Sequence, residues 1–203
     1  MSDLVPPDAG SVLCVIARRA IAARLGVTSP PFGTREAAHH PDEAGESSLR
    51  HEDAWLDTPG AAFVTLTMHG ALRGCIGTLR AYRPLREDVA ANAVSAAVHD
   101  PRFPPLTASE LGETHIEVSV LSTPEPLPFA NHADAVARLH PRVDGVILEY
   151  GSHRGTFLPQ VWEQLPHAGD FLSHLVRKAG LPAGWWDDDA RLFHYTVTAF
   201  EET

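Results

Sequence analysis

The clearest pattern of hydrophobic positions lies in the first half of the chain. An apolar stretch, Ala62–Met68, ends at a His-Gly dipeptide, and a second stretch covers residues 71–79. Short apolar stretches separated by a turn signal are typical of a β-hairpin. The second stretch contains Gly74 and Gly77, and glycine within a strand often marks a bulge or the close approach of another backbone or a ligand. We therefore predict an antiparallel hairpin whose second strand is marked by glycine.

Two registers are open to this hairpin. A loop of two residues would place Cys75 in the core. A loop of three residues pairs Leu66 with Gly74, and it sets Arg73 and Cys75 on the face opposite to Leu72. We prefer the longer loop because it gathers the apolar residues on one face, and because such loops with a residue in the left-handed region are common in hairpins.

The remaining pattern mixes helical and alternating segments. Apolar residues at helical spacing predict helices over residues 12–25, 84–99 and 170–179, and a further short helix is expected over residues 159–164. Asn131 is a candidate cap for a helix through residue 139. Alternation predicts strands over residues 115–122 and 192–200. Residues 28–50 have no apolar period and are rich in Pro, Gly, Ser, Glu and His, so we expect a surface loop or partial disorder. The expected fold class is α+β, with antiparallel sheets flanked by helices.

A shorter echo of the first hairpin follows in the second half. Residues 146–148, Gly151 and Arg154-Gly155 repeat its pattern with an offset of one residue. In each half the hairpin is followed by helix and then by an alternating strand. This order predicts an internal duplication of a hairpin–helix–strand unit. Residues 1–203 would then form one domain built from two subdomains that meet near residues 123–142.

Composition narrows the function classes. The net charge of −10 argues against general nucleic-acid binding, which needs a basic surface. No stretch reaches the roughly 18 apolar residues of a membrane helix, and the N-terminus has no signal-peptide pattern. Cys14 and Cys75 have no metal-ligand spacing, so no metal site is predicted and the cofactor stays unknown. We expect a cytoplasmic protein, and the bias toward Arg, Ala, Pro and His suggests a bacterial origin.

Candidate chemistry centres on the glycine-marked strand. Cys75 lies between its two glycines, and the preferred register puts the Arg73 guanidinium beside the thiol, where a cation favours the reactive thiolate. Arg73 and Arg102 belong to a group of arginines between residues 72 and 102, which suggests a site for a small anionic ligand. The alternative is a purely structural role, in which Cys75 is a small core residue and the arginines pair with acidic loops.

Four segments carry a resemblance to a known family. The hexapeptide at residues 72–77, Leu-Arg-Gly-Cys-Ile-Gly, resembles the signature of the AMMECR family. Three further segments resemble later blocks of that family and come in the same order, at residues 100–106, 157–161 and 177–180. The resemblance spans most of the chain. It implies the family's α+β fold, and it marks Arg73, Gly74, Cys75, Gly77 and Arg102 as family-typical positions.

The resemblance does not imply a reaction, because the activity of the family is not established. It leaves two hypotheses. The first is an enzyme in which Cys75 is the candidate catalytic residue and Arg73, Gly74, Gly77 and Arg102 line a cleft for a small anionic ligand. The second is a non-catalytic adaptor whose signature strand is structural. Many prokaryotic members resemble one part of a system with a Memo-like protein and a radical S-adenosylmethionine protein, so these are the expected partners.

Overall fold

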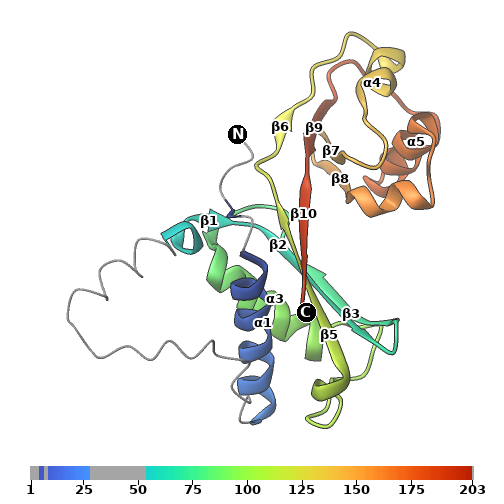
Figure 1. The fold of residues 1–203 in the computed structure, drawn as a ribbon. Helices are drawn as coiled ribbons and strands as arrows, with labels where there is room; N and C mark the ends of the chain where they lie inside the picture. The colour runs from blue at the N-terminus through green and yellow to red at the C-terminus, as the bar shows by residue number, and fades with distance from the viewer. Residues whose placement is uncertain (1–4, 7–8, 28–53, 203) are drawn as a thin grey trace. The chain divides into compact units, whose positions relative to one another are not determined.

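The computed structural model of the chain describes residues 5–6, 9–27 and 54–202, so the loop predicted over residues 28–50 lies outside the described residues (Figure 1). The chain divides into two compact units. Unit 1 comprises Met1–Leu121 and Thr198–Thr203, and unit 2 comprises Ser122–Val197. Both contain helices packed on antiparallel strands, which confirms the predicted α+β class.

Unit 1 is built on a four-stranded sheet with the order β10-β5-β2-β3. Its strands are β2 (Ala62–Met68), β3 (Ala71–Gly77), β5 (Thr114–Leu121) and β10 (Val197–Glu201). Its helices are α1 (Ala9–Leu25) and α3 (Leu85–Val98), and it includes the short 3-10 turns η1 (Ala54–Asp57) and η2 (Leu111–Glu113). A small ladder joins β1 (Pro59–Gly60) to β4 (Arg83–Pro84) just before α3.

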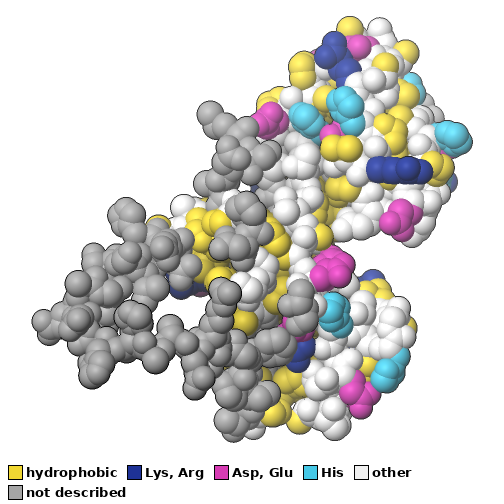
Figure 2. Space-filling model, viewed as in Figure 1, with side chains coloured by type: hydrophobic (Ala, Val, Ile, Leu, Met, Phe, Trp, Pro, Cys, Tyr) yellow, Lys and Arg dark blue, Asp and Glu magenta, His cyan; other side chains and the backbone are white. Residues whose placement is uncertain are grey.

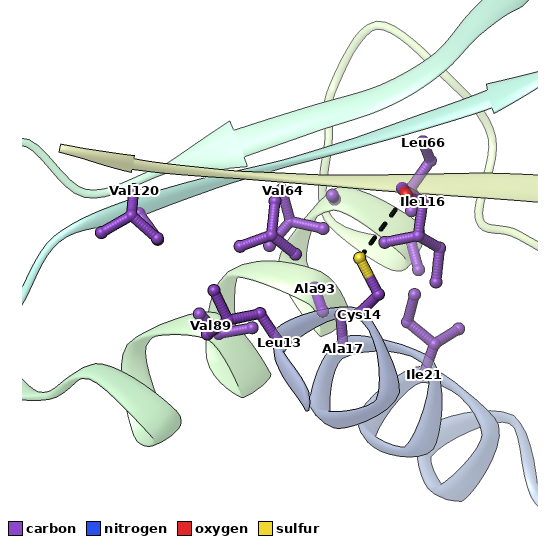
Figure 3. Packing of buried hydrophobic residues seen from close by; sticks show 14 of the residues in the cluster. Leu13, Cys14, Ala17, Ile21, Val64, Leu66, Val89, Ala93, Ile116 and Val120 are labelled. Atoms are coloured by element: carbon purple, nitrogen blue, oxygen red, sulfur yellow. Dashed lines mark hydrogen bonds between the residues drawn. The ribbon is translucent and has the colours of Figure 1, made fainter. Parts of the chain in front are cut away.

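The core of unit 1 lies between the sheet and the two helices (Figure 3). Val64 and Leu66 on β2 point toward the helices together with Ile116 on β5. Alanines on α3, such as Ala93, let the helix approach the sheet closely, because a methyl group occupies little space. Alternate residues of β2 and β5 are therefore committed to packing, and the residues between them point to the other face of the sheet.

The register of the β2–β3 hairpin combines the two alternatives. Leu66 pairs with Gly74 and Thr65 with Cys75, as the preferred register predicts. Closer to the turn that prediction is wrong, because Thr67 pairs with Leu72 and the loop has two residues. His69 and Gly70 have φ angles of 52° and 76°, and positive values at both loop residues define the hairpin turn that matches strand twist.

A register shift between Leu66 and Thr67 reconciles the two halves of the hairpin. Arg73 is the extra residue on β3, which makes this position a β-bulge. Because Leu72 pairs with Thr67 and Cys75 with Thr65, Leu72 lies on the same side of the sheet as Cys75. The prediction that these two residues point to opposite faces is therefore wrong. Strict alternation along β3 fails at the bulge.

Unit 2 contains a second four-stranded sheet, with the order β6-β9-β7-β8. Its strands are β6 (Glu125–Pro126), β7 (Gly145–Tyr150), β8 (His153–Phe157) and β9 (Arg191–Tyr195). Its helices are α4 (His132–Arg138), α5 (Ala168–Lys178) and the 3-10 segment η3 (Pro159–Glu163). The rings of Trp162 and Phe171 stack at 3.8 Å inside its core. Asn131 caps α4 by accepting a hydrogen bond from the Asp134 N–H, as predicted.

The strand predicted over residues 192–200 is divided in two. It breaks at Thr196, so β9 pairs with β7 in one sheet, whereas β10 joins β5 in the other. Within each unit, the first hairpin strand lies between its hairpin partner and the later strand, giving β5-β2-β3 and β9-β7-β8. The two orders match, and the duplication itself stays a prediction. No described helix is both long enough and apolar enough to cross a bilayer.

Candidate functional site

The two glycines of β3 serve close packing. A Cβ atom at Gly74 would lie 2.2 Å from the carbonyl oxygen of Ala96 on α3, so a side chain there would push the helix away. A Cβ atom at Gly77 would lie 2.1 Å from the ring of Phe63, its cross-strand partner on β2. Both glycines were predicted to bind a ligand, and the structure instead places them against the chain's own backbone and side chains.

Arg73 is buried, and its hydrogen bonds go to residues other than Cys75. Its Nε and Nη2 donate to the two carboxylate oxygens of Glu110 at 3.2 Å each. Nη1 donates to the Pro104 carbonyl at 2.9 Å. The fork holds the pKa of Glu110 down at about 2, with the Thr107 backbone and side chain as further donors. The bulge thus aims Arg73 at the loop that follows α3, where the guanidinium closes the loop onto the strand.

The backbone of Cys75 at the edge of the sheet is held by a second ion pair. Asp100 Oδ2 accepts the Cys75 N–H at 2.9 Å, and Arg102 Nη2 donates to the Cys75 carbonyl at 3.1 Å. The two side chains also bind each other, with Nη2 of Arg102 at 2.7 Å from Oδ2 of Asp100. The Arg102 hydrogen bond lowers the pKa of Asp100 well below its usual range, although burial opposes this. We call these two residues the edge clamp.

Arg102, and not Arg73, is therefore the cation at Cys75. The pKa of Arg102 is raised above its ordinary value, chiefly by the hydrogen bond to Asp100 and also by Cys75. The Arg102 side chain is 53% exposed. Its Nε and Nη2 donate the hydrogen bonds to Asp100 and to the Cys75 carbonyl. The structure thus brings Cys75 and Arg102 together, whereas Arg73 contacts Glu110.

The thiol of Cys75 lies on the sheet face that does not carry the core. The Thr65 hydroxyl donates to its Sγ at 3.4 Å, and the thiol is half-buried. Thr65 also pairs with Glu117 on β5, so Glu117, Thr65 and Cys75 form a cross-strand row on neighbouring strands. Ser119 donates to Glu117 at 2.9 Å. This row places a thiol, a hydroxyl and a carboxylate side by side on three strands.

The other cysteine has a different environment. Cys14 on α1 is buried, and its thiol points toward the Ile116 carbonyl at 3.9 Å (Figure 3). Burial raises the pKa of Cys14 to about 11, with Glu202 as a second cause. This position makes Cys14 a packing residue of the unit 1 core. Cys14 therefore serves as an internal reference for the reactivity of Cys75.

The described residues contain no group of three or more His, Cys, Asp or Glu side chains that could hold a metal ion. Two histidines lie in or next to the hairpin turns: His69 pairs with Glu113 at 3.0 Å, and His153 contacts the Ala179 carbonyl at 3.1 Å. Neither bonds to Cys75. On the face shown in Figure 2, acidic, basic and histidine side chains are interspersed. This distribution agrees with the many local ion pairs.

Sequence reasoning missed the residues that hold the site. Asp100, Glu110 and Thr65 were not among the predicted site residues. Asp100 and Arg102 are two residues apart, a spacing at which one carboxylate can accept both a distant backbone N–H and its neighbour's guanidinium. The signal that could have found this clamp is an acidic residue directly after an alanine-rich helix, facing an edge strand.

Comparison with known proteins places the chain. The AMMECR1 family model matches residues 14–200. The chain belongs to the AMMECR1 family. It is 37% identical over 204 residues to a protein of Methanothermobacter thermautotrophicus, covering 96% of this chain and 95% of that protein. It is 38% identical over 207 residues to a protein of Thermococcus onnurineus, covering 95% and 90%.

The fold of this family member agrees with a solved structure. The uncharacterized protein PH0010 from Pyrococcus horikoshii has a TM-score of 0.75 to this chain and is 32% identical in sequence, and the match covers 98% of this chain and 94% of that one. The relatives named above come from archaea. Their names state no activity, ligand or partner.

Proposed function

We propose that this AMMECR1-family protein is an enzyme that acts on a small anionic substrate, with Cys75 as its nucleophile. The observation that carries the proposal is the Cys75 thiol itself, which is half-buried, receives a hydrogen bond from Thr65 and lies beside the exposed guanidinium of Arg102. A thiol buried only for packing has no need of a cation and a hydroxyl donor. Reactive cysteines occur in such partially exposed surroundings.

Arg102 binds the substrate in this proposal. Asp100 neutralises part of its charge, so a carboxylate or phosphate is held by hydrogen bonds from the exposed part of the guanidinium and not by long-range attraction. The clamp also fixes the backbone of Cys75, so the thiol and the anion-binding donors keep a constant separation. Fixed geometry between a nucleophile and a bound substrate is a large part of enzymatic rate enhancement.

The proposed step is nucleophilic attack by the sulfur on an electrophilic carbon of the bound substrate. The Sγ–carbon bond forms as the bond to the leaving group breaks, and the leaving group takes that bond's electrons and the thiol proton. Water then releases the product and restores the thiol.

Unit 2 does not repeat this row of side chains. In its own sheet, the positions that correspond to Cys75, Thr65 and Glu117 are occupied by Thr156, Ile147 and Phe193. The ionisable row is thus a property of unit 1.

A non-catalytic adaptor is the second candidate. It is favoured by the packing roles of Arg73, Gly74 and Gly77, since each has a structural partner within unit 1. Under this proposal the signature hexapeptide builds the edge of the sheet and the protein presents a surface to partners. The Memo-like and radical S-adenosylmethionine proteins implied by the resemblance are the candidate partners, and a cytoplasmic location would suit both proposals.

The rate of alkylation distinguishes the two proposals. With iodoacetate, an anionic reagent, Cys75 in the native protein should react faster than Cys14 near neutral pH, because Cys14 is buried and its pKa is about 11. The Arg102→Gln variant should react more slowly than the native protein with both reagents, because the cation beside the thiol is lost, and the slowing should be several-fold larger for iodoacetate than for neutral iodoacetamide. Mass spectrometry of the peptides assigns each adduct.

Arg73→Gln is the matched control for Arg102→Gln. It removes a guanidinium from β3, the strand that carries Cys75, but this guanidinium does not contact the thiol. The substitution should therefore lower stability, and any change in the alkylation rate should be equal for both reagents. If Cys75 reacts only on unfolding, as Cys14 should, the enzyme proposal fails and the adaptor remains. Equal slowing of both reagents by Arg102→Gln would refute the anion-binding role of Arg102.

A further inference from the structure

The free edge of β8 in unit 2 differs from the edge of β3 in unit 1. β8 is the last strand in the order β6-β9-β7-β8 and pairs with β7. Tyr150 and His153 close a two-residue turn, and the alternation of an antiparallel ladder then directs the N–H and C=O groups of Arg154 and Thr156 outward. Within residues 54–202 no hydrogen bond reaches these outward groups.

The chain itself shows how such an edge can be satisfied. Cys75 holds the place on β3 that Thr156 holds on β8, and its outward N–H and C=O are taken by Asp100 and Arg102. The N–H acceptor is a carboxylate carried by an adjoining segment of chain. The described residues after α5 supply no such clamp to Thr156.

The opposite edge of the unit 2 sheet is closed to strand pairing. β6 has two residues, Glu125–Pro126, and proline has no N–H to donate. Very short edge strands and prolines are common devices by which proteins prevent unwanted pairing. β8 has five residues, His153–Phe157, and contains no proline. Of the two edges of this sheet, β8 is therefore the one open to another strand.

Several cationic side chains lie on or next to β8, although the chain as a whole is acidic. α5 packs on β8 and ends with Arg177 and Lys178, whose side chains are exposed. The Lys178 ammonium lies 4.8 Å from the centroid of the Phe157 ring on β8. Arg154 on β8 adds a guanidinium, which shares the Glu149 carboxylate with Arg191. This group of cations stands out in a chain whose net charge is −10.

We propose that β8 binds an extended acidic segment of a partner protein by β-strand addition. The outward groups of Arg154 and Thr156 supply backbone hydrogen bonds to the added strand, as in other proteins that take peptides onto a sheet edge. Arg154, Arg177 and Lys178 select acidic side chains on it. This interaction surface belongs to unit 2 and is independent of the chemistry proposed for Cys75.

Binding of a fluorescein-labelled peptide to the full chain tests this proposal. The probe is a short synthetic peptide that alternates Val or Thr with Glu, and its partner probe has Lys in place of each Glu. Fluorescence anisotropy should show binding of the Glu peptide that weakens as salt rises, and weaker binding of the Lys peptide. Thr156→Pro should weaken the Glu peptide about tenfold, because proline removes an outward donor.

Thr156→Val is the matched control, because it loses the same hydroxyl contact with Tyr195 but keeps the N–H. It should bind the Glu peptide as the native chain does. Replacing Arg177 and Lys178 with Glu should weaken the Glu peptide and strengthen the Lys peptide. The fold of Thr156→Pro is checked by circular dichroism. The proposal is overturned if the folded Thr156→Pro variant binds the Glu peptide as tightly as Thr156→Val does, or if the native chain binds the Glu and Lys peptides alike.

A second copy of the chain is the competing occupant. If β8 pairs with β8 of another molecule, light scattering will show a dimer that Thr156→Pro dissociates, and the acidic peptide will bind only by competing with that dimer. This outcome would overturn the proposed partner. A monomer at all concentrations, together with charge-dependent peptide binding, supports it.

Discussion

The hairpin of unit 1 has one residue more than the hairpin of unit 2. Leu66 pairs with Gly74 on β3, and Leu148 pairs with Gly155 on β8, and each glycine packs against a helix. The additional residue in unit 1 is Arg73, which forms the bulge. The offset of one residue between the two sequence patterns is thus a structural feature. Because of it, Arg73 leaves the β2–β3 ladder and bonds to Pro104 and Glu110 in the segment that follows α3.

The remaining difference lies on the face away from the helices. In unit 1 that face carries the row of Glu117, Thr65 and Cys75, whereas the corresponding row in unit 2 has no ionisable side chain. The helix-facing residues of the two hairpins are alike because they have to pack. The helix-facing sides of the two hairpins thus meet one common packing requirement, whereas the opposite faces carry different side chains in the two units.

The largest expected effect on stability comes from adding a methyl group at the glycine of each hairpin that packs against a helix, Gly74 in unit 1 and Gly155 in unit 2. Gly74→Ala should lower the free energy of unfolding by about 3 kcal/mol, since overpacking against a backbone oxygen cannot be relieved by a side-chain rotation. Gly155→Ala should cost about 1 kcal/mol, because its Cβ would lie 2.9 Å from the Ala179 nitrogen, compared with 2.2 Å at Gly74. Urea unfolding measures both, and equal losses would contradict the comparison.

Next in size is the loss of the arginine in each hairpin. Arg73→Met should cost about 1–3 kcal/mol, because the Arg73 side chain is 9% exposed and Glu110 loses its partner. Arg154→Met should cost less than about 1 kcal/mol, since that side chain is 34% exposed. Thermal unfolding of the two variants makes the test. A larger effect in Arg154→Met would show that the bulge is not the stronger anchor.

A smaller and local effect is expected at the edge clamp. Amide exchange followed by NMR should show the Cys75 N–H protected and the Thr156 N–H exchanging quickly in the native chain. Asp100→Ala should raise the exchange of Cys75 by the equivalent of about 1 kcal/mol, and leave Thr156 unchanged. If Cys75 exchanges as fast as Thr156 before the substitution, the clamp does not close the edge in solution.

The smallest effect is a pH dependence from Glu110. Its pKa falls from 4.5 to about 2 in the folded chain, so its contribution to stability is complete above pH 4.5 and is lost as the pH falls toward 2. Glu110→Gln should therefore differ most from the native chain near neutral pH, and the difference should shrink in acid. Unfolding at several pH values provides the measurement. A difference that grows as the pH falls would contradict stabilisation by the ionised Glu110 carboxylate.

The sequence determined most of the fold by itself. Apolar spacing and end signals located α3 within a residue at each end and also placed α5, the β2–β3 hairpin and the strand β5. These features depend on residues close together in the chain, where hydrophobic period and capping express themselves directly. The ordered blocks of the signature also sufficed to identify the family.

Tertiary structure decided the features that depend on distant residues. Whether Arg73 faced Cys75 depended on a bulge and on Glu110, 37 residues away. The cation that does reach Cys75, Arg102, was a predicted site residue, but its role in the edge clamp needed the loop after α3 to return to β3. The division at Thr196 depended on which sheet offered a free edge. Local pattern carries no information about such long-range pairings, because their energy arises only when separate segments meet.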